Sequence, residues 1–393
     1  MIKNLTVRFF SCSIFYLLLS VTLGVALAAG FLSRNAIPAH AHLALIGWVS
    51  ITIIGAMYQL VPTIRGTELF SEKLANLQFW MINIGTMGLF LGLLLENFWM
   101  KVFFGFLLLV SSYIFAYIIF KTLFSIKERI ELTLRFFGIA ILYFLIAITL
   151  GLLMIANVIP NFLGAHAHLA LIGWVSLTIM GAEYQMVPML ALKELYSEKL
   201  SNIQFWMVNS GAIGIFFAFV ISSKILIGLF GGVFFISSLI FAWIIYKTLT
   251  QDKKMQEKVD ISVKFFLTAI IYLLIASILG LFLPFGILYL KIAHVHLALV
   301  GWVSLTIIGG MYHIMPMLVW MEKYGEKLGK EPIPMIKDMY SERLANSILW
   351  MVNAGTIGMF FGAIFGKLFL LSGIIIALAS YLFAFDMFNV LRR

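Results

Sequence analysis

Apolar runs of about 20 residues follow one another along the whole of this 393-residue sequence. A helix needs roughly 20 predominantly apolar residues to cross about 30 Å of hydrocarbon, so each run is long enough to span a membrane. The composition agrees, because 63% of the residues are hydrophobic and only 11% are charged. The sequence therefore predicts an all-α integral membrane protein in contact with the lipid bilayer, with no segment left for a large soluble domain.

The apolar runs predict twelve transmembrane helices. They are expected at residues 9–32, 38–62, 75–95, 102–120, 136–158, 164–190, 203–222, 225–246, 265–288, 292–318, 347–365 and 368–390. The first run is too long for a signal peptide and lacks a small-residue cleavage site, so we expect it to be retained as a helix. The single cysteine, Cys12, excludes an internal disulfide and a thiolate metal cluster, and is expected to pack in this helix.

The net charge of +10 is better explained by membrane topology than by nucleic-acid binding. The helix ends opposite the N-terminus carry only five of the 27 lysines and arginines: Arg34, Lys101, Lys224, Lys291 and Lys367. The other 22 lie on the side of the N-terminus, including Lys253, Lys254 and Lys258 in one loop. Cytoplasmic loops are enriched in lysine and arginine. We therefore expect a multi-pass protein of the cell (inner) membrane with both termini in the cytoplasm.

One sequence block occurs three times. Residues 39–50 return as 165–176 and, with two substitutions to valine, as 293–304, at spacings of 126 and 128 residues. A second block begins with Ser-Glu at Ser71, Ser197 and Ser341. This internal repeat contains four helices, an even number, so all copies share one orientation.

We therefore expect three four-helix repeats around a pseudo-threefold axis along the membrane normal. The repeats are residues 1–130, 131–258 and 259–393, within one membrane domain. The third copy has a longer loop at residues 319–346. Its Lys, Glu and Pro content is typical of a cytoplasmic surface loop, either a connector or a partner contact.

All seven histidines lie in these repeats: His40, His42, His166, His168, His294, His296 and His313. Two residues on an α-helix correspond to about 200° of rotation, so the two members of each His-x-His motif face opposite sides of their helix. If helices two, six and ten surround the axis, the six histidines of these motifs form three facing pairs, one in each gap.

Two facing imidazoles suit the axial positions of a haem iron, whereas zinc usually takes three or four protein ligands. We therefore predict these six histidines as axial ligands of up to three haems, with b-type haem favoured. The alternative is that they hydrogen-bond across helices and hold the bundle together.

The chain resembles the catalytic subunit, subunit I, of haem–copper oxidases and nitric-oxide reductases, which has twelve helices in three arcs and haem ligands on helices two, six and ten. The closest likeness is to helix ten of the C-type members. Its His-x-His, Gly-Trp, Tyr and Pro are similar to His294, His296, Gly301, Trp302, Tyr312 and Pro316. A more distant likeness is to the twelve-helix haem membrane proteins of the nitric-oxide stress response.

The resemblance implies specific histidine pairs. These pairs are His40 with His296 and His168 with His294, and extension by the repeat adds His42 with His166, which has no counterpart in the oxidases. The family's copper or non-haem iron needs one histidine from helix six and two from helix seven, but residues 169–293 contain no histidine. This departure argues against copper and against transfer of the family's oxygen- or nitric-oxide-reducing activity.

Glu183 and His313 break the symmetry of the repeats. They lie 15 and 17 residues beyond the second histidine of their helices, roughly 22–26 Å along the axis at 1.5 Å per residue, and so near the cytoplasmic interface. We expect solvated side chains there, with proton entry or a quinone site as the alternative. We also expect Asn83, Asn209 and Asn353 to form hydrogen bonds between helices.

Three functions fit these patterns. The first is a multi-haem membrane protein for electron transport or another gas- or redox-related role, since bis-histidine ligation leaves no open iron position. Such a protein would exchange electrons with a redox partner or a quinol. The alternatives are a haem carrier or transporter, and a copper-less oxidoreductase of the oxygen- or nitric-oxide-reductase type. The sequence assigns no catalytic residue.

Overall fold

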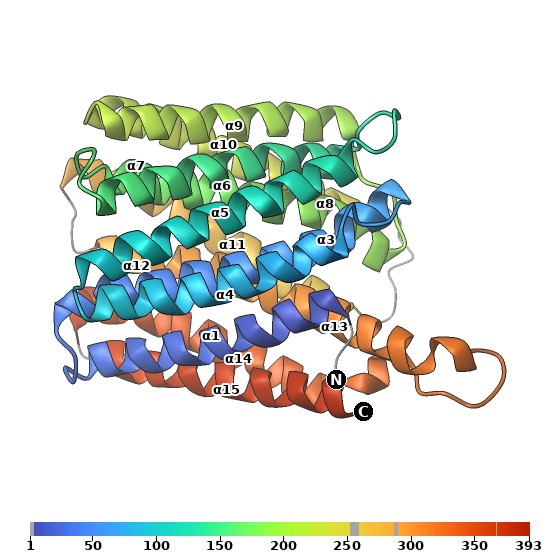
Figure 1. Cartoon of the computed structure of the whole chain (residues 1–393). Coiled ribbons are helices and arrows are strands. Elements are labelled where there is room, and N and C mark those ends of the chain that lie inside the picture. The colour runs from blue at the N-terminus through green and yellow to red at the C-terminus, as the bar shows by residue number, and fades with distance from the viewer. Residues whose placement is uncertain (1–3, 252–258, 287–289, 367) are drawn as a thin grey trace.

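The computed structural model describes residues 4–251, 259–286, 290–366 and 368–393. Lys253, Lys254, Lys258 and Lys367, which entered the predicted topology, lie outside the described residues. Twelve helices within the described ranges are long and apolar enough to cross a membrane. They run side by side in one bundle, and both termini lie at the same end of it (Figure 1). The all-α, twelve-helix prediction is confirmed.

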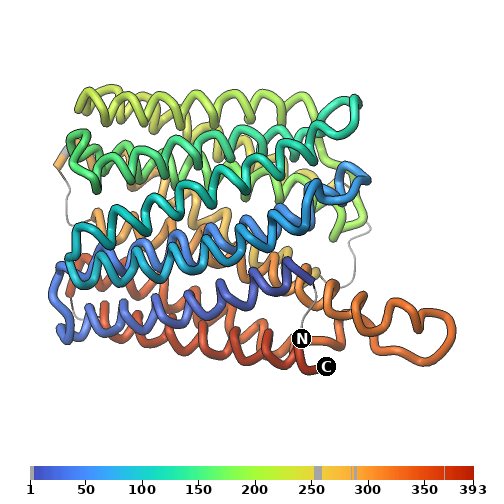
Figure 2. The backbone as a smooth tube through the Cα atoms, in the orientation of Figure 1, coloured from blue at the N-terminus to red at the C-terminus, as the bar shows by residue number. Residues whose placement is uncertain are grey.

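Nine of these twelve spans are continuous α-helices. They are α1 (Leu5–Ala28), α4 (Glu72–Leu94), α5 (Phe98–Leu123), α6 (Leu132–Ile155), α9 (Glu198–Val220), α10 (Lys224–Thr250), α11 (Ile261–Phe282), α14 (Glu342–Phe365) and α15 (Phe369–Arg392). Figure 2 shows how the connections alternate between the two ends of the bundle. Short 3-10 turns occur at η1 (Arg34–Ala36), η4 (Leu283–Phe285), η6 (Gly325–Lys327) and η7 (Ile336–Met339).

The other three spans are composite and contain the His-x-His motifs. Each has a short α-helix that ends at the second histidine, then eight residues of π-helix, then a longer α-helix. The segments are α2 (Ile37–His42), η2 (Leu43–Ser50) and α3 (Ile51–Arg65); α7 (Leu163–His168), η3 (Leu169–Ser176) and α8 (Leu177–Ala191); and α12 (Leu290–His296), η5 (Leu297–Ser304) and α13 (Leu305–Tyr324). π-Helix is rare in proteins, and where it occurs it is often at a functional site. These segments therefore mark the repeated block as a candidate functional region.

Helix ends differ from the prediction where polar residues cap them. Helix α4 begins at Glu72, three residues early, because the Ser71 side chain accepts a hydrogen bond from the backbone N–H of Leu74. Ser197 and Ser341 cap α9 and α14 in the same way. The second repeated block is therefore a helix-capping signal, strengthened by a glutamate in the first turn.

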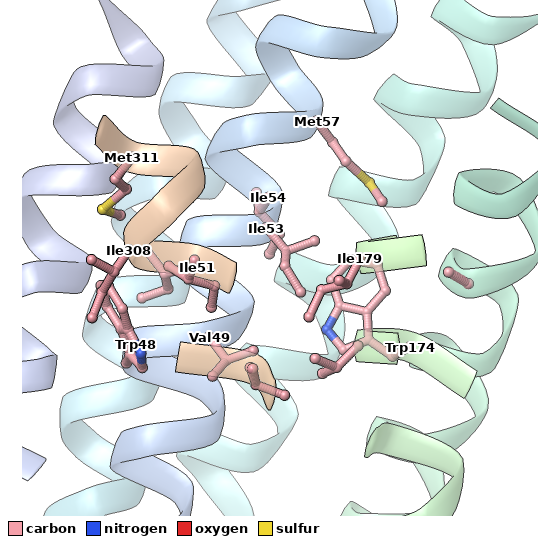
Figure 3. Packing of buried hydrophobic residues seen from close by; sticks show 14 of the residues in the cluster. Trp48, Val49, Ile51, Ile53, Ile54, Met57, Trp174, Ile179, Ile308 and Met311 are labelled. Carbon is pink, nitrogen blue, oxygen red and sulfur yellow. The ribbon is translucent and has the colours of Figure 1, made fainter. Parts of the chain in front are cut away.

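Three buried tryptophans connect the composite spans. Their indole N–H groups donate to serine hydroxyls: Trp48 to Ser304 at 3.0 Å, Trp174 to Ser50 at 3.1 Å, and Trp302 to Ser176 at 3.0 Å. Each composite span thus donates to one neighbour and accepts from the other. Figure 3 shows Trp48 and Trp174 among the buried isoleucines and methionines of this core. The ring of bonds, called here the Trp–Ser ring, fixes the three spans side by side.

A second set of hydrogen bonds joins the helix before each composite span to the helix after it: α1 to α4, α6 to α9, and α11 to α14. The hydroxyls of Tyr16, Tyr143 and Tyr272 donate to the Asn83 carbonyl at 3.0 Å, to Asn209 Oδ1 at 3.0 Å and to Asn353 Oδ1 at 2.8 Å. The predicted interhelical role is confirmed for the side chains of Asn209 and Asn353, whereas the Asn83 side chain donates to the Phe79 carbonyl of its own helix. A Cβ added to Gly47, Gly173 or Gly301 would overlap one of these tyrosine rings. These glycines of the Gly-Trp motifs therefore serve helix packing.

The long loop of the third copy is ordered by bonds to its own chain. Helix α13 continues to Tyr324, past the predicted end, and the following segment projects beyond the bundle (Figure 1). The Trp320 indole donates to the Pro334 carbonyl at 2.6 Å, and the Tyr324 hydroxyl donates to the Arg393 carbonyl at 2.9 Å. These contacts attach the loop to the C-terminal end of the chain.

Candidate functional site

The six histidines of the His-x-His motifs lie in α2, α7 and α12. Helices α7 and α12 lie at the end of the bundle opposite the two termini (Figure 1). All six imidazoles are partly buried. The seventh histidine, His313, lies in α13, away from these motifs.

The structure brings the six side chains together as three pairs, each joining two different composite spans. The rings of His42 and His166 are 6.5 Å apart between centroids, with an angle of 22° between their planes. The other two pairs are close enough to interact electrostatically: His40 with His296, and His168 with His294. These are the partners that the resemblance and the repeat imply.

The second histidine of each motif is held by its own helix. His42 Nδ1 bonds to the Pro38 carbonyl at 2.8 Å, four residues earlier in the chain. His168 and His296 make the same bond at 2.8 and 2.9 Å.

The first histidine of each motif is held by the preceding span instead. His40 Nδ1 lies 3.0 Å from the Ser20 carbonyl on α1. His166 Nδ1 lies 2.9 Å from Ala147 on α6, and His294 Nδ1 lies 2.9 Å from Ala276 on α11. Every pair therefore combines one histidine held by its own helix with one held by another span.

These bonds determine which ring nitrogen is available to a ligand. A carbonyl accepts only from N–H, so each Nδ1 carries the proton and each Nε2 keeps its lone pair. Among the described residues, none of the six Nε2 atoms has a hydrogen-bond partner. Metal-ligating histidines characteristically donate their other N–H to a backbone carbonyl or carboxylate in this way.

Haem iron is a metal that this donor set could hold, because each imidazole keeps Nε2 free while its Nδ1 bonds to a backbone carbonyl. Two metal–nitrogen bonds of about 2 Å, plus roughly 1 Å from each nitrogen to its ring centre, separate two ligating rings by roughly 6 Å. The 6.5 Å between His42 and His166 is close to this value. In the described ranges, no group of three or more His, Cys, Asp or Glu side chains is arranged to hold a metal ion. The candidate ligands are therefore pairs.

The surroundings of the three pairs differ. His168 stacks on Phe219 at 4.6 Å between ring centroids, and His296 meets Phe369 edge-on at 5.5 Å. Sequence reasoning missed three further residues, Gly24, Gly151 and Gly280, each of which lies against the first histidine of a motif. The sequence does contain a signal for these glycines, because one recurs 14 to 16 residues before the first histidine of each motif.

The expectation of a solvated Glu183 is wrong. Its side chain is 1% exposed, and its Oε1 accepts a hydrogen bond from the Thr306 hydroxyl at 3.4 Å. Among the described residues, its Oε2 is buried and has no partner. The corresponding residues Met57 and Met311 are equally buried, so the position faces the core in every copy. Depth along a helix does not determine which face a residue occupies, and this face is turned to the core. His313, by contrast, is half-buried.

Comparison with known proteins agrees with this architecture. The model of the family "Cytochrome C and Quinol oxidase polypeptide I" matches residues 6–99 and 98–227. An "Uncharacterized protein" of Aquifex aeolicus (strain VF5) is 28% identical over 310 residues, which cover 77% of each chain.

A solved structure, a haem–copper terminal oxidase dimer studied by cryo-electron microscopy, superposes with a TM-score of 0.73 at 14% identity. The match covers 100% of this chain and 85% of that one, and it shows the fold. Since the family model matches more than half of the sequence, this chain belongs to the cytochrome c and quinol oxidase polypeptide I family and is a member of the haem–copper oxidase subunit I superfamily.

Proposed function

We propose that this chain is a redox membrane protein that holds up to three b-type haems, each between two histidines, and that it transfers electrons. The observation that carries the proposal is the common orientation of six imidazoles, each with Nδ1 bonded to a backbone carbonyl and Nε2 free. Six independent packing histidines would not be expected to share one tautomer and one pairing rule. The family adds support, because its fold is that of redox enzymes of the membrane.

The protein's part in this function is to hold and orient the ligands. The Nδ1 bonds fix the ring planes and make Nε2 a better donor to a metal. Held by these histidine pairs, haem would supply one-electron transfer rather than gas binding. The π-helical segments after each second histidine, together with the Trp–Ser ring, would keep the facing imidazoles at a fixed spacing.

The proposed arrangement is three repeats, residues 1–130, 131–258 and 259–393, around a pseudo-threefold axis. The cyclic order of the Trp–Ser ring supports this arrangement. The ring joins every two of the three composite spans once, and so do the histidine pairs. With the termini in the cytoplasm, the histidines would lie near the outer face, within reach of an external redox partner or a quinol. The absence of histidine from residues 169–293 supports a site without copper.

The test is to count haem in the purified protein and record its reduced-minus-oxidised and pyridine-haemochrome spectra. We expect two or three low-spin b-type haems per chain that do not bind carbon monoxide. Haem that exchanges readily with an apo-protein acceptor would favour a haem carrier instead. Protein that is folded but free of haem after expression with excess haem would refute the proposal and leave the histidines as bonds between helices.

A further inference from the structure

A glycine accompanies each bond between a first histidine and the preceding span. The carbonyls that receive Nδ1 of His40, His166 and His294 belong to Ser20, Ala147 and Ala276. In all three cases a glycine follows four residues later in the same helix, at Gly24, Gly151 and Gly280. The three arrangements lie on different helices and share one local geometry.

The geometry explains why the residue is glycine. In an α-helix a carbonyl accepts the N–H of the residue four positions later, so a second donor must approach beside that residue. A Cβ at Gly24 or Gly151 would lie 2.9 Å from Cε1 of the histidine, and at Gly280 the distance would be 3.0 Å. These distances are shorter than ordinary carbon–carbon contact. A methyl group at these positions would therefore push the ring away from the carbonyl that it bonds to.

We propose that Gly24, Gly151 and Gly280, each with the carbonyl four residues earlier, are seats that position the first histidine of each motif as an iron ligand. This inference rests on the proposed function. The second histidines need no seat, because each bonds to its own helix. Each haem would therefore have one ligand whose orientation depends on the contact between two spans.

Each seat serves a different histidine pair. Gly24 serves the pair His40 and His296, Gly151 serves His42 and His166, and Gly280 serves His168 and His294. Filling one seat with a methyl group should displace one ligand and leave the other two pairs intact. A glycine that served only helix packing would change stability and leave the iron spin state alone.

The experiment compares Gly151→Ala with Gly138→Ala in the full-length, haem-loaded protein. Both glycines lie on α6, but a Cβ at Gly138 would meet Leu123 and Phe120 at ordinary distances of 3.7 and 3.8 Å. We expect Gly151→Ala to convert the one haem held by His42 and His166 from low-spin to high-spin and to let that haem bind carbon monoxide after reduction. Loss of that one haem, with the others unchanged, would equally support the seat. Gly138→Ala should match the wild type.

A low-spin, carbon-monoxide-resistant spectrum of Gly151→Ala, with full haem content, would overturn the inference and leave the proposed function standing. Wild-type protein without haem would refute the proposed function, and the inference with it. Gly24→Ala and Gly280→Ala are independent tests if Gly151→Ala is not recovered in folded form. Each should change a different haem, and the sum of the two difference spectra should equal that of the double variant.

Discussion

Replacing Glu183 with methionine is expected to raise the stability of the protein. The carboxyl is 1% exposed and its Oε2 has no partner among the described residues. A buried polar group without a partner costs about 1–3 kcal/mol. Methionine removes this cost and has nearly the same length, and it is the residue found at the corresponding positions Met57 and Met311.

The expected gain follows from the bonds that are lost. The 3.4 Å bond from Thr306 is long and is worth at most about 1 kcal/mol. Thr306 keeps its 2.9 Å bond to the Trp302 carbonyl, so the hydroxyl is not left unpaired. The net stabilisation is therefore up to about 3 kcal/mol, which corresponds to an increase in Tm of up to about 4 °C for a chain of this length.

The assay is thermal unfolding in one detergent, followed by tryptophan fluorescence. Glu183→Gln, which keeps a polar group but cannot be charged, is the control and should fall between the wild type and Glu183→Met. If both variants unfold at lower temperature than the wild type, the carboxyl has a stabilising partner, and the argument from its burial fails.

The other predictions concern the ligands, the core and a helix cap. His42→Ala and His166→Ala should abolish the same haem signal, whereas His313→Ala should leave every haem signal unchanged; loss of two different signals would contradict the pairing. Trp302→Phe should lower the free energy of unfolding by about 1–3 kcal/mol, because a buried hydrogen bond of the Trp–Ser ring is lost, and unchanged denaturation would count against the ring. Ser71→Ala should cost about 0.5–2 kcal/mol through its cap on α4, as measured by the same thermal assay.

Hydropathy was enough to predict the membrane fold because bilayer thickness sets helix length directly. It located all twelve spans, and the errors lie at their ends. Helix α1 ends at Ala28, four residues early, and Gly30 then adopts a left-handed φ of 78°. Such ends depend on single capping and turn residues, which a hydropathy window averages away.

The candidate site was predictable only in part. The pairing of His42 with His166 followed from helix periodicity, the repeat and the resemblance to a known family. The π-helical segments did not, because apolar periodicity does not reveal a change from i−4 to i−5 hydrogen bonding. The partners of Nδ1 are all backbone carbonyls, three of them on other spans. A backbone carbonyl is present at every residue, so the sequence does not reveal which one is used. The burial of Glu183 does not follow from its sequence position, because depth along a helix does not determine which face a residue occupies.

The Trp–Ser ring does not depend on which composite span comes first in the chain. Each composite span donates one bond and accepts one, so the ring has a direction but no beginning. The two chain ends lie at the same end of the bundle, where α1 packs against α15 (Figure 1). A circular permutant that joins these ends and opens in a loop between two composite spans would therefore recreate the same ring, with any of the three composite spans translated first.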